Sequence, residues 1–207
     1  TKIFVIILAL IVSFYILMDK EALLREAERV FRAIFEDKTV DKIKQFVDDA
    51  NAIFVKFVLG KSLDSLIIGI LCFIGLTILK SPYSVLISVI VGVTNMIPYF
   101  GPFIGEVIGF IFVAFVNPVK AVWVLLYILI LQQFDSFILT PKILGDKMGI
   151  NPLWVIFSIV LGGRLFGIIG MFLGAPTIAV VLFAIRRYVD KRLKEKEQER
   201  TENNALE

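Results

Sequence analysis

One long stretch of this chain is almost free of charge, and this feature limits its possible folds more than any other. Residues 62–185 carry only nine of the 41 charged side chains. These nine are Asp64, Lys80, Glu106, Lys120, Asp135, Lys142, Asp146, Lys147 and Arg164. Soluble domains carry charge on about a quarter of their residues. With 58% hydrophobic residues and a mean hydropathy of +0.86 for the whole chain, the stretch predicts helices embedded in a membrane.

The composition also excludes several classes of protein. The sequence has no histidine, and its single cysteine, Cys72, lies within an apolar run. A zinc cluster, an intrachain disulfide and a histidine-based triad therefore cannot form within one chain. The glycines at 162–174 do not have the GxGxxG spacing, which excludes a nucleotide-driven pump. We expect no enzyme, cofactor or metal, and the net charge of +3 indicates no nucleic-acid partner.

The first third of the chain predicts two different segments. Residues 1–18 predict a transmembrane helix with a truncated start, because their apolar run is slightly short for a bilayer and no methionine precedes it. Residues 19–61 predict an amphipathic helical insert with Asp19 and Thr39 as N-caps. Its nine acidic and nine basic residues balance. This balance favours a helical pair, packed on itself or on a neighbouring subunit, over an anchor on the lipid surface.

Residues 62–185 predict the transmembrane core, which two backbone interruptions divide. Pro98, Gly101 and Pro102 break one apolar segment into halves that are each too short to span a bilayer. We expect a re-entrant hairpin there, with a single kinked crossing as the alternative. A second interruption lies at residues 162–164. Broken backbone at membrane depth persists only where protein or a wet cavity satisfies its polar groups.

The two interrupted segments also resemble each other. Residues 81–92 align with residues 151–162 at an offset of 70, with Pro, Val, Ser and Gly at four matching positions. An apolar alphabet produces such matches by chance, so an internal repeat and a coincidence remain equal alternatives. Short, Gly/Pro-interrupted segments in corresponding places point to a transporter binding site. A hairpin in the first copy would make the repeats inverted, whereas a kinked crossing would make them parallel.

Glycines and polar residues in the core are the candidate functional positions. Glycines spaced for close helix packing are Gly101, Gly105 and Gly109, followed by Gly163, Gly167, Gly170 and Gly174. Glu106 and Arg164 each follow an interruption, and a charge at membrane depth requires a partner or water. A structural ion pair or a side chain that snorkels to the interface is an equal alternative. The candidate solute or ion path is Asn95, Pro98, Gly101, Pro102, Glu106, Gln132, Gln133, Asp135 and Arg164, although Gln132, Gln133 and Asp135 are as readily interfacial.

Four ordered motifs resemble the autoinducer-2 exporter family of bacterial and archaeal membrane proteins. They lie at residues 95–105, 132–145, 151–153 and 163–176, within a match over about residues 57–188. The resemblance implies an all-helical permease that exports a small polar signalling molecule of quorum sensing, has no covalent cofactor and assembles as a homo-oligomer. Some members of the family are credited with sodium/proton antiport. The chain lacks the first helical hairpin expected of the family, and the insert at residues 19–61 is short for it.

The sequence thus predicts an all-α polytopic membrane protein with broken or re-entrant helices and an amphipathic helical insert. Basic residues crowd the start of the tail at residues 186–207, so the positive-inside rule places the C-terminus in the cytoplasm of a multi-pass protein of the inner or plasma membrane. We expect the tail to extend the last helix and to fray by Thr201. Three functions remain open: export of a small polar solute, cation/proton antiport coupled to Na⁺ or H⁺, and a membrane scaffold that transports nothing.

Overall fold

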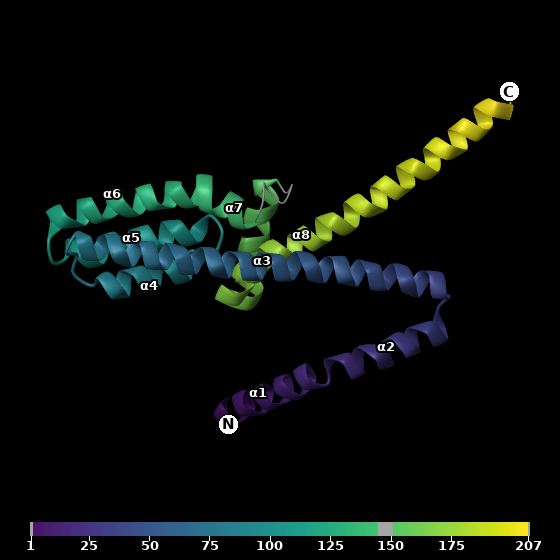
Figure 1. The fold of residues 1–207 in the computed structure, drawn as a ribbon, viewed down its shortest axis with the longest axis horizontal. Helices are drawn as coiled ribbons and strands as arrows, with labels where there is room; N and C mark the ends of the chain where they lie inside the picture. The colour runs from purple at the N-terminus through teal and green to yellow at the C-terminus, as the bar shows by residue number, and fades with distance from the viewer. Residues whose placement is uncertain (1, 145–150, 207) are drawn as a thin grey trace. The chain divides into compact units, whose positions relative to one another are not determined.

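The computed structural model describes residues 2–144 and 151–206, and in them the chain is helical with no strand (Figure 1). The helices are α1 (Lys2–Met18), α2 (Lys20–Ile34), α3 (Asp37–Ile78), α4 (Ser84–Thr94), α5 (Phe100–Ala114), α6 (Pro118–Phe134), the π-helix η1 (Asp135–Leu139), α7 (Thr140–Leu144) and α8 (Pro152–Leu206). The chain divides into two compact units, Thr1–Asp49 and Ala50–Glu207. The all-α class predicted from the sequence is confirmed.

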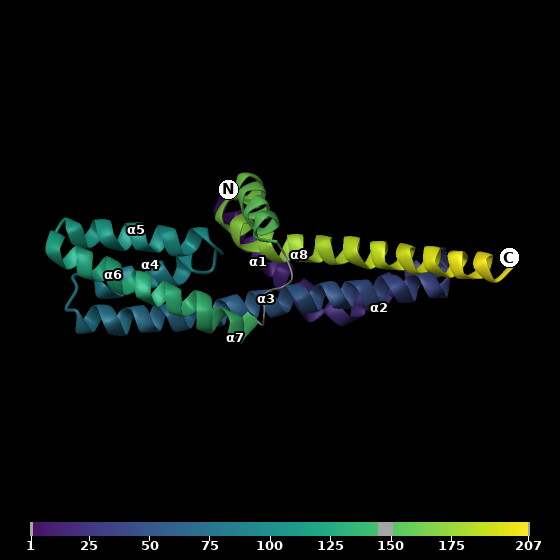
Figure 2. The same cartoon turned by 90° about the horizontal axis from the view of Figure 1, so that it is seen from above.

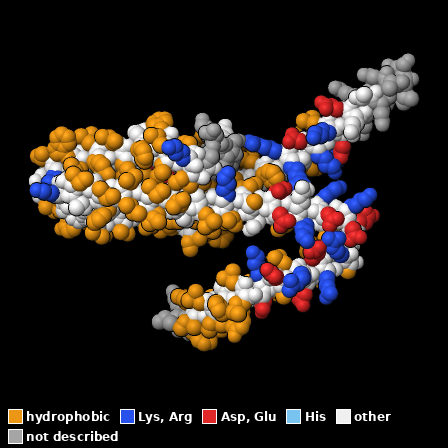
Figure 3. All heavy atoms as spheres, viewed as in Figure 1, with side chains coloured by type: hydrophobic (Ala, Val, Ile, Leu, Met, Phe, Trp, Pro, Cys, Tyr) orange, Lys and Arg blue, Asp and Glu red, His pale blue; other side chains and the backbone are white. Residues whose placement is uncertain are grey.

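Three helical stretches are long and apolar enough to cross a membrane. They are Asp37–Ile78, Pro118–Leu144 and Pro152–Gln198, whereas Phe4–Met18, α4 and α5 are apolar but shorter. Much of their surface consists of exposed apolar side chains, which would be costly in water and are expected in lipid (Figure 3).

The first unit contains α1, α2 and the start of α3. Asp19 occupies the N-cap position of α2 as expected, but its side chain makes no capping hydrogen bond. Thr39 is not a cap, because α3 begins at Asp37 and Thr39 already lies in its first turn. The chain turns between α2 and α3, and only Val40 is buried in the described side chains of these two helices up to residue 49.

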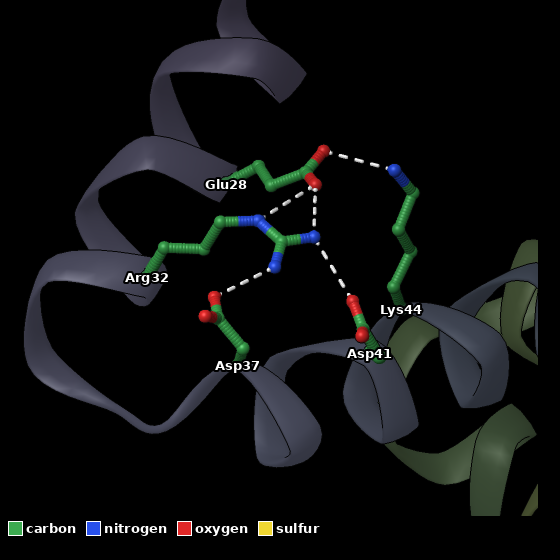
Figure 4. A network of polar contacts seen from close by, with 5 residues as sticks. All are labelled: Glu28, Arg32, Asp37, Asp41 and Lys44. Atoms are coloured by element: carbon green, nitrogen blue, oxygen red, sulfur yellow. Dashed lines mark hydrogen bonds and ion pairs between the residues drawn. The ribbon is translucent and has the colours of Figure 1, made fainter.

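Charged side chains link α2 to the start of α3 (Figure 4). Arg32 donates to Glu28 Oε1 at 2.8 Å, to Asp37 Oδ1 at 3.0 Å and to Asp41 Oδ1 at 2.9 Å, and Lys44 donates to Glu28 Oε2 at 2.9 Å. The Arg32 and Lys44 hydrogen bonds lower the pKa of the Glu28 carboxyl, and the three carboxylates raise the pKa of Arg32. The insert is thus a helical pair held partly by charge.

In the second unit, α4 and α5 form an antiparallel hairpin (Figure 1 and Figure 2). The Cα of Gly101 lies against the Thr94 carbonyl, Gly105 packs on Val91 and Gly109 packs on Ile87, so contacts pair in opposite order along the two helices. A side chain at Gly101 would overlap the Thr94 carbonyl oxygen. Tyr99 has φ = 64° at the tip, where the proline-rich segment turns. The hairpin interpretation of this segment therefore agrees with the structure.

A second hairpin lies within α8. The helix reverses at Gly167, where φ = 65° and ψ = −144° suit only glycine, and the backbones of Gly162 and Gly170 then meet, as do those of Ser158 and Gly174. Beyond the hairpin, α8 continues to Leu206, so the fraying predicted at Thr201 is wrong.

Equivalent serines in the two aligned segments make similar local hydrogen bonds. The Ser88 hydroxyl donates to the Val85 carbonyl at 3.0 Å, and the Ser158 hydroxyl donates to the Val155 carbonyl at 2.8 Å, at the same offset of 70. Both copies of the proposed repeat therefore begin a hairpin with the same local hydrogen bond.

Two apolar clusters hold the second unit together. The larger one joins α3, α4, α5 and α6 through residues such as Ile68, Ile87, Val113 and Ile128, all fully buried. The smaller one joins α3 to both arms of the α8 hairpin through Phe57, Ile159 and Ala175. The part of α3 around Phe57 thus packs on the α8 hairpin, and the part around Ile68 packs on the hairpin of α4 and α5.

Candidate functional site

A buried polar cluster lies in the apolar interior of the second unit. Lys61 and Asp64 come from α3, Asn95 from the end of α4, and Asp135 from the first position of η1. All four are at most 6% exposed. Burying a charge away from water is costly unless it is paired and hydrogen-bonded, so such a cluster within membrane helices requires an explanation.

The four side chains contact one another directly. Lys61 Nζ lies 2.5 Å from Asp64 Oδ2 and 3.9 Å from Asp135 Oδ2. Asn95 Nδ2 donates to the same two oxygens, Asp64 Oδ2 and Asp135 Oδ2, each at 3.2 Å. One ammonium and one amide therefore bridge two carboxylates from different helices. With both carboxylates ionised, the cluster has a formal charge of −1.

Local backbone features place two of these residues. Asn95 caps the C-terminus of α4 just before the proline-rich tip of the hairpin, so the hairpin turn positions its side chain. Asp135 begins the π-helix η1, and its Oδ1 accepts a hydrogen bond of 3.0 Å from Thr140 Oγ1. Short π-helical turns inside α-helices occur often at functional sites.

Several buried polar atoms around the cluster lack a hydrogen-bond partner in the described residues. They are Asp64 Oδ1, Ser65 Oγ, Asn95 Oδ1, Gln132 Nε2 and Gln132 Oε1. Ser65 and Gln132 are each 5% exposed, and Gln132 precedes Asp135 by one helical turn. Unsatisfied buried groups cost about 1–3 kcal/mol each, so each of these atoms requires an explanation such as a bound water, an ion or another polar partner.

A groove of about 500 Å³ lies between α3 and α4 beside this cluster. Its walls include Leu66, Phe73 and Met96, and its floor is the close approach of Gly69 to Gly92. Ser65, whose hydroxyl lacks a partner, lines the groove and follows Asp64 in the chain. The groove thus passes next to the polar cluster from the apolar surface of the helices.

The structure brings together some of the residues predicted from the sequence. Asn95 and Asp135 are bonded in the cluster, and Gln132 is buried one turn away. Pro98, Gly101 and Pro102 form the hairpin tip that follows Asn95. Gln133, in contrast, is exposed.

Glu106 and Arg164 do not meet. Glu106 is partly buried on α5, Arg164 is exposed on the first arm of α8, and neither makes an ion pair with a described residue. The predicted glycines have packing roles within hairpins. Gly105 and Gly109 lie between α4 and α5, Gly163, Gly170 and Gly174 lie between the two arms of α8, and Gly167 forms the turn.

Two central residues, Lys61 and Asp64, were not predicted as site residues. Both lie at the start of an apolar run, where charged residues usually mark the membrane boundary. Their spacing was the available signal, because residues three apart share a helix face and can form an ion pair. In the structure the two side chains are paired and buried. No group of three Cys, Asp or Glu side chains suited to a metal occurs in the described part of the chain.

Comparison with known proteins shows that the chain is similar to members of a transporter family. The sequence profile of AI-2E family transporters matches residues 1–190. The chain is 31% identical over 201 residues to the putative transport protein YueF of Bacillus subtilis, covering 97% of this chain and 53% of that protein. It is 37% identical over 137 residues to the putative transport protein YrrI of B. subtilis, covering 66% of this chain and 38% of that one.

A more distant relative is the putative permease PerM of Escherichia coli, which is 26% identical over 190 residues, covering 91% of this chain and 52% of PerM. The chain thus spans about half the length of the curated relatives that it matches, or less. No protein of solved structure gives a significant match.

Proposed function

This chain belongs to the AI-2E family of transporters, and we propose that it forms part of a permease that exports a small polar solute related to autoinducer-2. The observation that carries the proposal is the buried polar cluster of Lys61, Asp64, Asn95 and Asp135 inside apolar helices. A protein that only anchors or scaffolds has no need of unsatisfied polar atoms at that depth.

The solute would supply the partners that these atoms lack. A polyhydroxylated molecule can donate to Asp64 Oδ1 and Asn95 Oδ1 and can accept from Gln132 Nε2, which are three of the five unpartnered atoms. The hairpin tip at Pro98, Gly101 and Pro102 would move with Asn95, opening or closing this contact. Glu106, Gln133 and Arg164 lie outside the cluster, and we retain them as candidate positions along the rest of the path.

Transport in proteoliposomes tests this proposal. We expect the wild-type protein to move autoinducer-2 and Asn95→Ala to reduce the initial rate about tenfold or more, because two hydrogen bonds to carboxylates are lost. Asn51→Ala is the matched control, since Asn51 is an exposed amide on α3 that lies outside the cluster and the candidate path. Equal rates for the two variants would remove the cluster from the solute path. Equal rates in protein-containing and protein-free liposomes would contradict export of this solute.

A second candidate function is cation/proton antiport, with Na⁺ or H⁺ as the coupling ion. It is favoured by one specific feature, the single ammonium of Lys61 between two buried carboxylates. Such a group of charges can exchange a proton or an ion without leaving a large net charge in the membrane. A sodium-dependent pH change inside proteoliposomes, abolished by Asp64→Asn, would support it. A sodium-independent pH trace would exclude it.

Two further features of the whole protein are proposed on general grounds. We propose that the C-terminus is cytoplasmic, which the basic start of the tail supports, and thiol labelling of a cysteine introduced at residue 196 in intact cells tests this orientation. Re-entrant hairpins of opposite orientation and a homo-oligomer follow from the family resemblance and the repeat. A membrane scaffold without transport is the outcome if neither transport assay responds.

A further inference from the structure

The polar cluster resembles a cation site that already contains a cation. Asp64 Oδ2 and Asp135 Oδ2 both face Lys61 Nζ, at 2.5 and 3.9 Å, and both also accept from Asn95 Nδ2. Carboxylate and amide oxygens are the ligands that hard cations prefer in proteins. The ammonium is therefore placed where an oxygen-coordinated cation would be bound.

Lys61 satisfies this site incompletely. Asp64 Oδ1 and Asn95 Oδ1 have no partner, and the hydroxyl of the neighbouring Ser65 has none either. While it is bonded to Asp64 Oδ2, the ammonium leaves these acceptors unsatisfied, whereas a free cation has no stem and can take a position that engages more of them. Asp64 Oδ1 and Asn95 Oδ1 can only accept, so these two atoms, which belong to the residues bonded around Lys61, suit a cation better than an anion.

The ammonium of Lys61 can also reach a polar region outside the cluster. Lys61 lies at the boundary between the polar segment at residues 19–61 and the apolar run that follows. A lysine has a flexible four-carbon stem and can extend its ammonium to a nearby polar region while its stem stays on apolar surface. Leaving the cluster therefore does not require Lys61 to lose its charge.

We propose that Lys61 is a tethered internal cation that occupies a site for a small monovalent cation, made by Asp64, Asp135 and Asn95, and that a cation from solution replaces it. This inference rests on the second function proposed above and adds the identity of the competing group. The tether gives the ammonium a high effective concentration, so Lys61 lowers the apparent affinity of the site for free cations. Exchange of one positive charge for another keeps the formal charge of the cluster constant.

The test measures cation binding through thermal unfolding of the purified protein in detergent. Tm is followed during titration with NaCl, with N-methyl-D-glucamine chloride added to hold the ionic strength constant. A ligand that binds the folded state raises Tm in proportion to its occupancy. We expect Lys61→Gln to lower the apparent Kd for sodium about tenfold or more, because the internal competitor is lost.

Three matched variants define the result. Lys61→Arg retains the tethered charge and is expected to behave like the wild type. Lys120→Gln removes a lysine whose Nζ donates to the Lys80 carbonyl outside the cluster, and it should leave the sodium response unchanged. Lys61→Gln with Asp64→Asn should lose the sodium response, since it removes both the competitor and a ligand.

The proposal would be overturned if Lys61→Gln had the same apparent Kd for sodium as the wild type. It would also be overturned if sodium and N-methyl-D-glucamine raised the Tm of Lys61→Gln equally. If Lys61→Gln does not fold, amine labelling of the wild-type protein with a membrane-permeant imidoester decides the matter. Lys61 should be modified faster in sodium than in N-methyl-D-glucamine, and equal rates refute the displacement. If sodium binding depends on Lys61 but the protein transports nothing, this inference is supported and the proposed function is contradicted. If the protein transports a solute but sodium has no effect on the Tm of any variant, the proposed function is supported and this inference is contradicted.

Discussion

Replacing Gly101 with alanine should separate the two helices of the first hairpin and disturb the polar cluster at the same time. A Cβ at this position would overlap the Thr94 carbonyl oxygen and lie 3.1 Å from the Asn95 Cα. Neither neighbour is the flexible end of a side chain, so the backbone must shift. The Thr94 carbonyl accepts the Ile97 amide at 2.9 Å, which means that this shift reaches the turn itself.

The expected cost has two parts. Forcing an extra methyl into a packed contact costs about 1–3 kcal/mol. If Asn95 moves with the tip and loses its hydrogen bonds to Asp64 and Asp135, about 1.5–3 kcal/mol more is lost, because the acceptors are charged. For a chain of this size, these losses predict a fall in Tm of at least about 2 °C, measured by tryptophan fluorescence in detergent.

Gly69→Ala is the matched control. Its Cβ would lie 3.5 Å from the Gly92 Cα, an ordinary van der Waals distance, and alanine favours a helix over glycine by about 0.5–1 kcal/mol. We therefore expect Gly69→Ala to be neutral or slightly stabilising. If Gly101→Ala unfolds at the same temperature as Gly69→Ala, the close approach at the hairpin tip is not a constraint and the reasoning is refuted.

Three other perturbations test different parts of the fold. Gly167→Ala should destabilise the protein by about 1–3 kcal/mol, measured by chemical denaturation, because φ = 65° with ψ = −144° is strained for any residue other than glycine. The added Cβ would meet no atom within 4 Å, so the cost comes from the backbone alone, and Gly167→Asn should be equally destabilising. Lys61→Met should cost about 3–5 kcal/mol by leaving two carboxylates without their cation, and Lys61→Met with Asp64→Leu should cost less than the sum of the single changes. Hydrogen-exchange protection of the turn between α2 and α3 should be higher at neutral pH than in acid. The hydrogen bond from Arg32 lowers the pKa of Glu28 from its ordinary value in the folded state, so protonation of Glu28 in acid removes the attraction.

Each of these expectations has a clear counter-result. Wild-type stability of Gly167→Ala would mean that the reversal in α8 tolerates a side chain. Strictly additive effects of Lys61→Met and Asp64→Leu would mean that the two charges are independent. For the α2–α3 turn, Glu28→Gln is the control, and a pH response that persists in this variant would assign the effect to another carboxyl.

The sequence predicted the parts of the fold that depend on local chemistry. The charge-poor stretch predicted membrane helices, and Pro98, Gly101 and Pro102 predicted the break that forms the first hairpin, because these residues limit the backbone wherever they occur. The turn of the second hairpin at Gly167 lies three residues beyond the predicted interruption. Glycines at 162 and 170 allow both arms to meet there, and that contact depends on pairing between arms, which spacing alone does not show.

The candidate site was harder to predict because its contacts are distant in sequence. Asn95 bonds to Asp64 across 31 positions and to Asp135 across 40. Lys61 and Asp64 look like boundary residues in a sequence, since only the packing of α3 against the hairpin buries them. Glu106 and Arg164 were predicted as site residues because each follows a backbone interruption. The sequence around them does not show whether their side chains face the protein interior or the surface.

The two hairpins share their architecture but not their chemistry. In the repeat alignment, the position equivalent to Asn95 is Leu165, which is exposed, and the serines Ser88 and Ser158 make the same bond in both copies. The two hairpins therefore share a pattern of helix packing, whereas the polar side chains of the cluster come from the first hairpin together with α3 and η1. Substitutions at the tip of the first hairpin should then alter both stability and ligand binding, and those at Gly167 should alter stability alone. A dependence of ligand binding on both tips would instead mean that the second hairpin also lines the path.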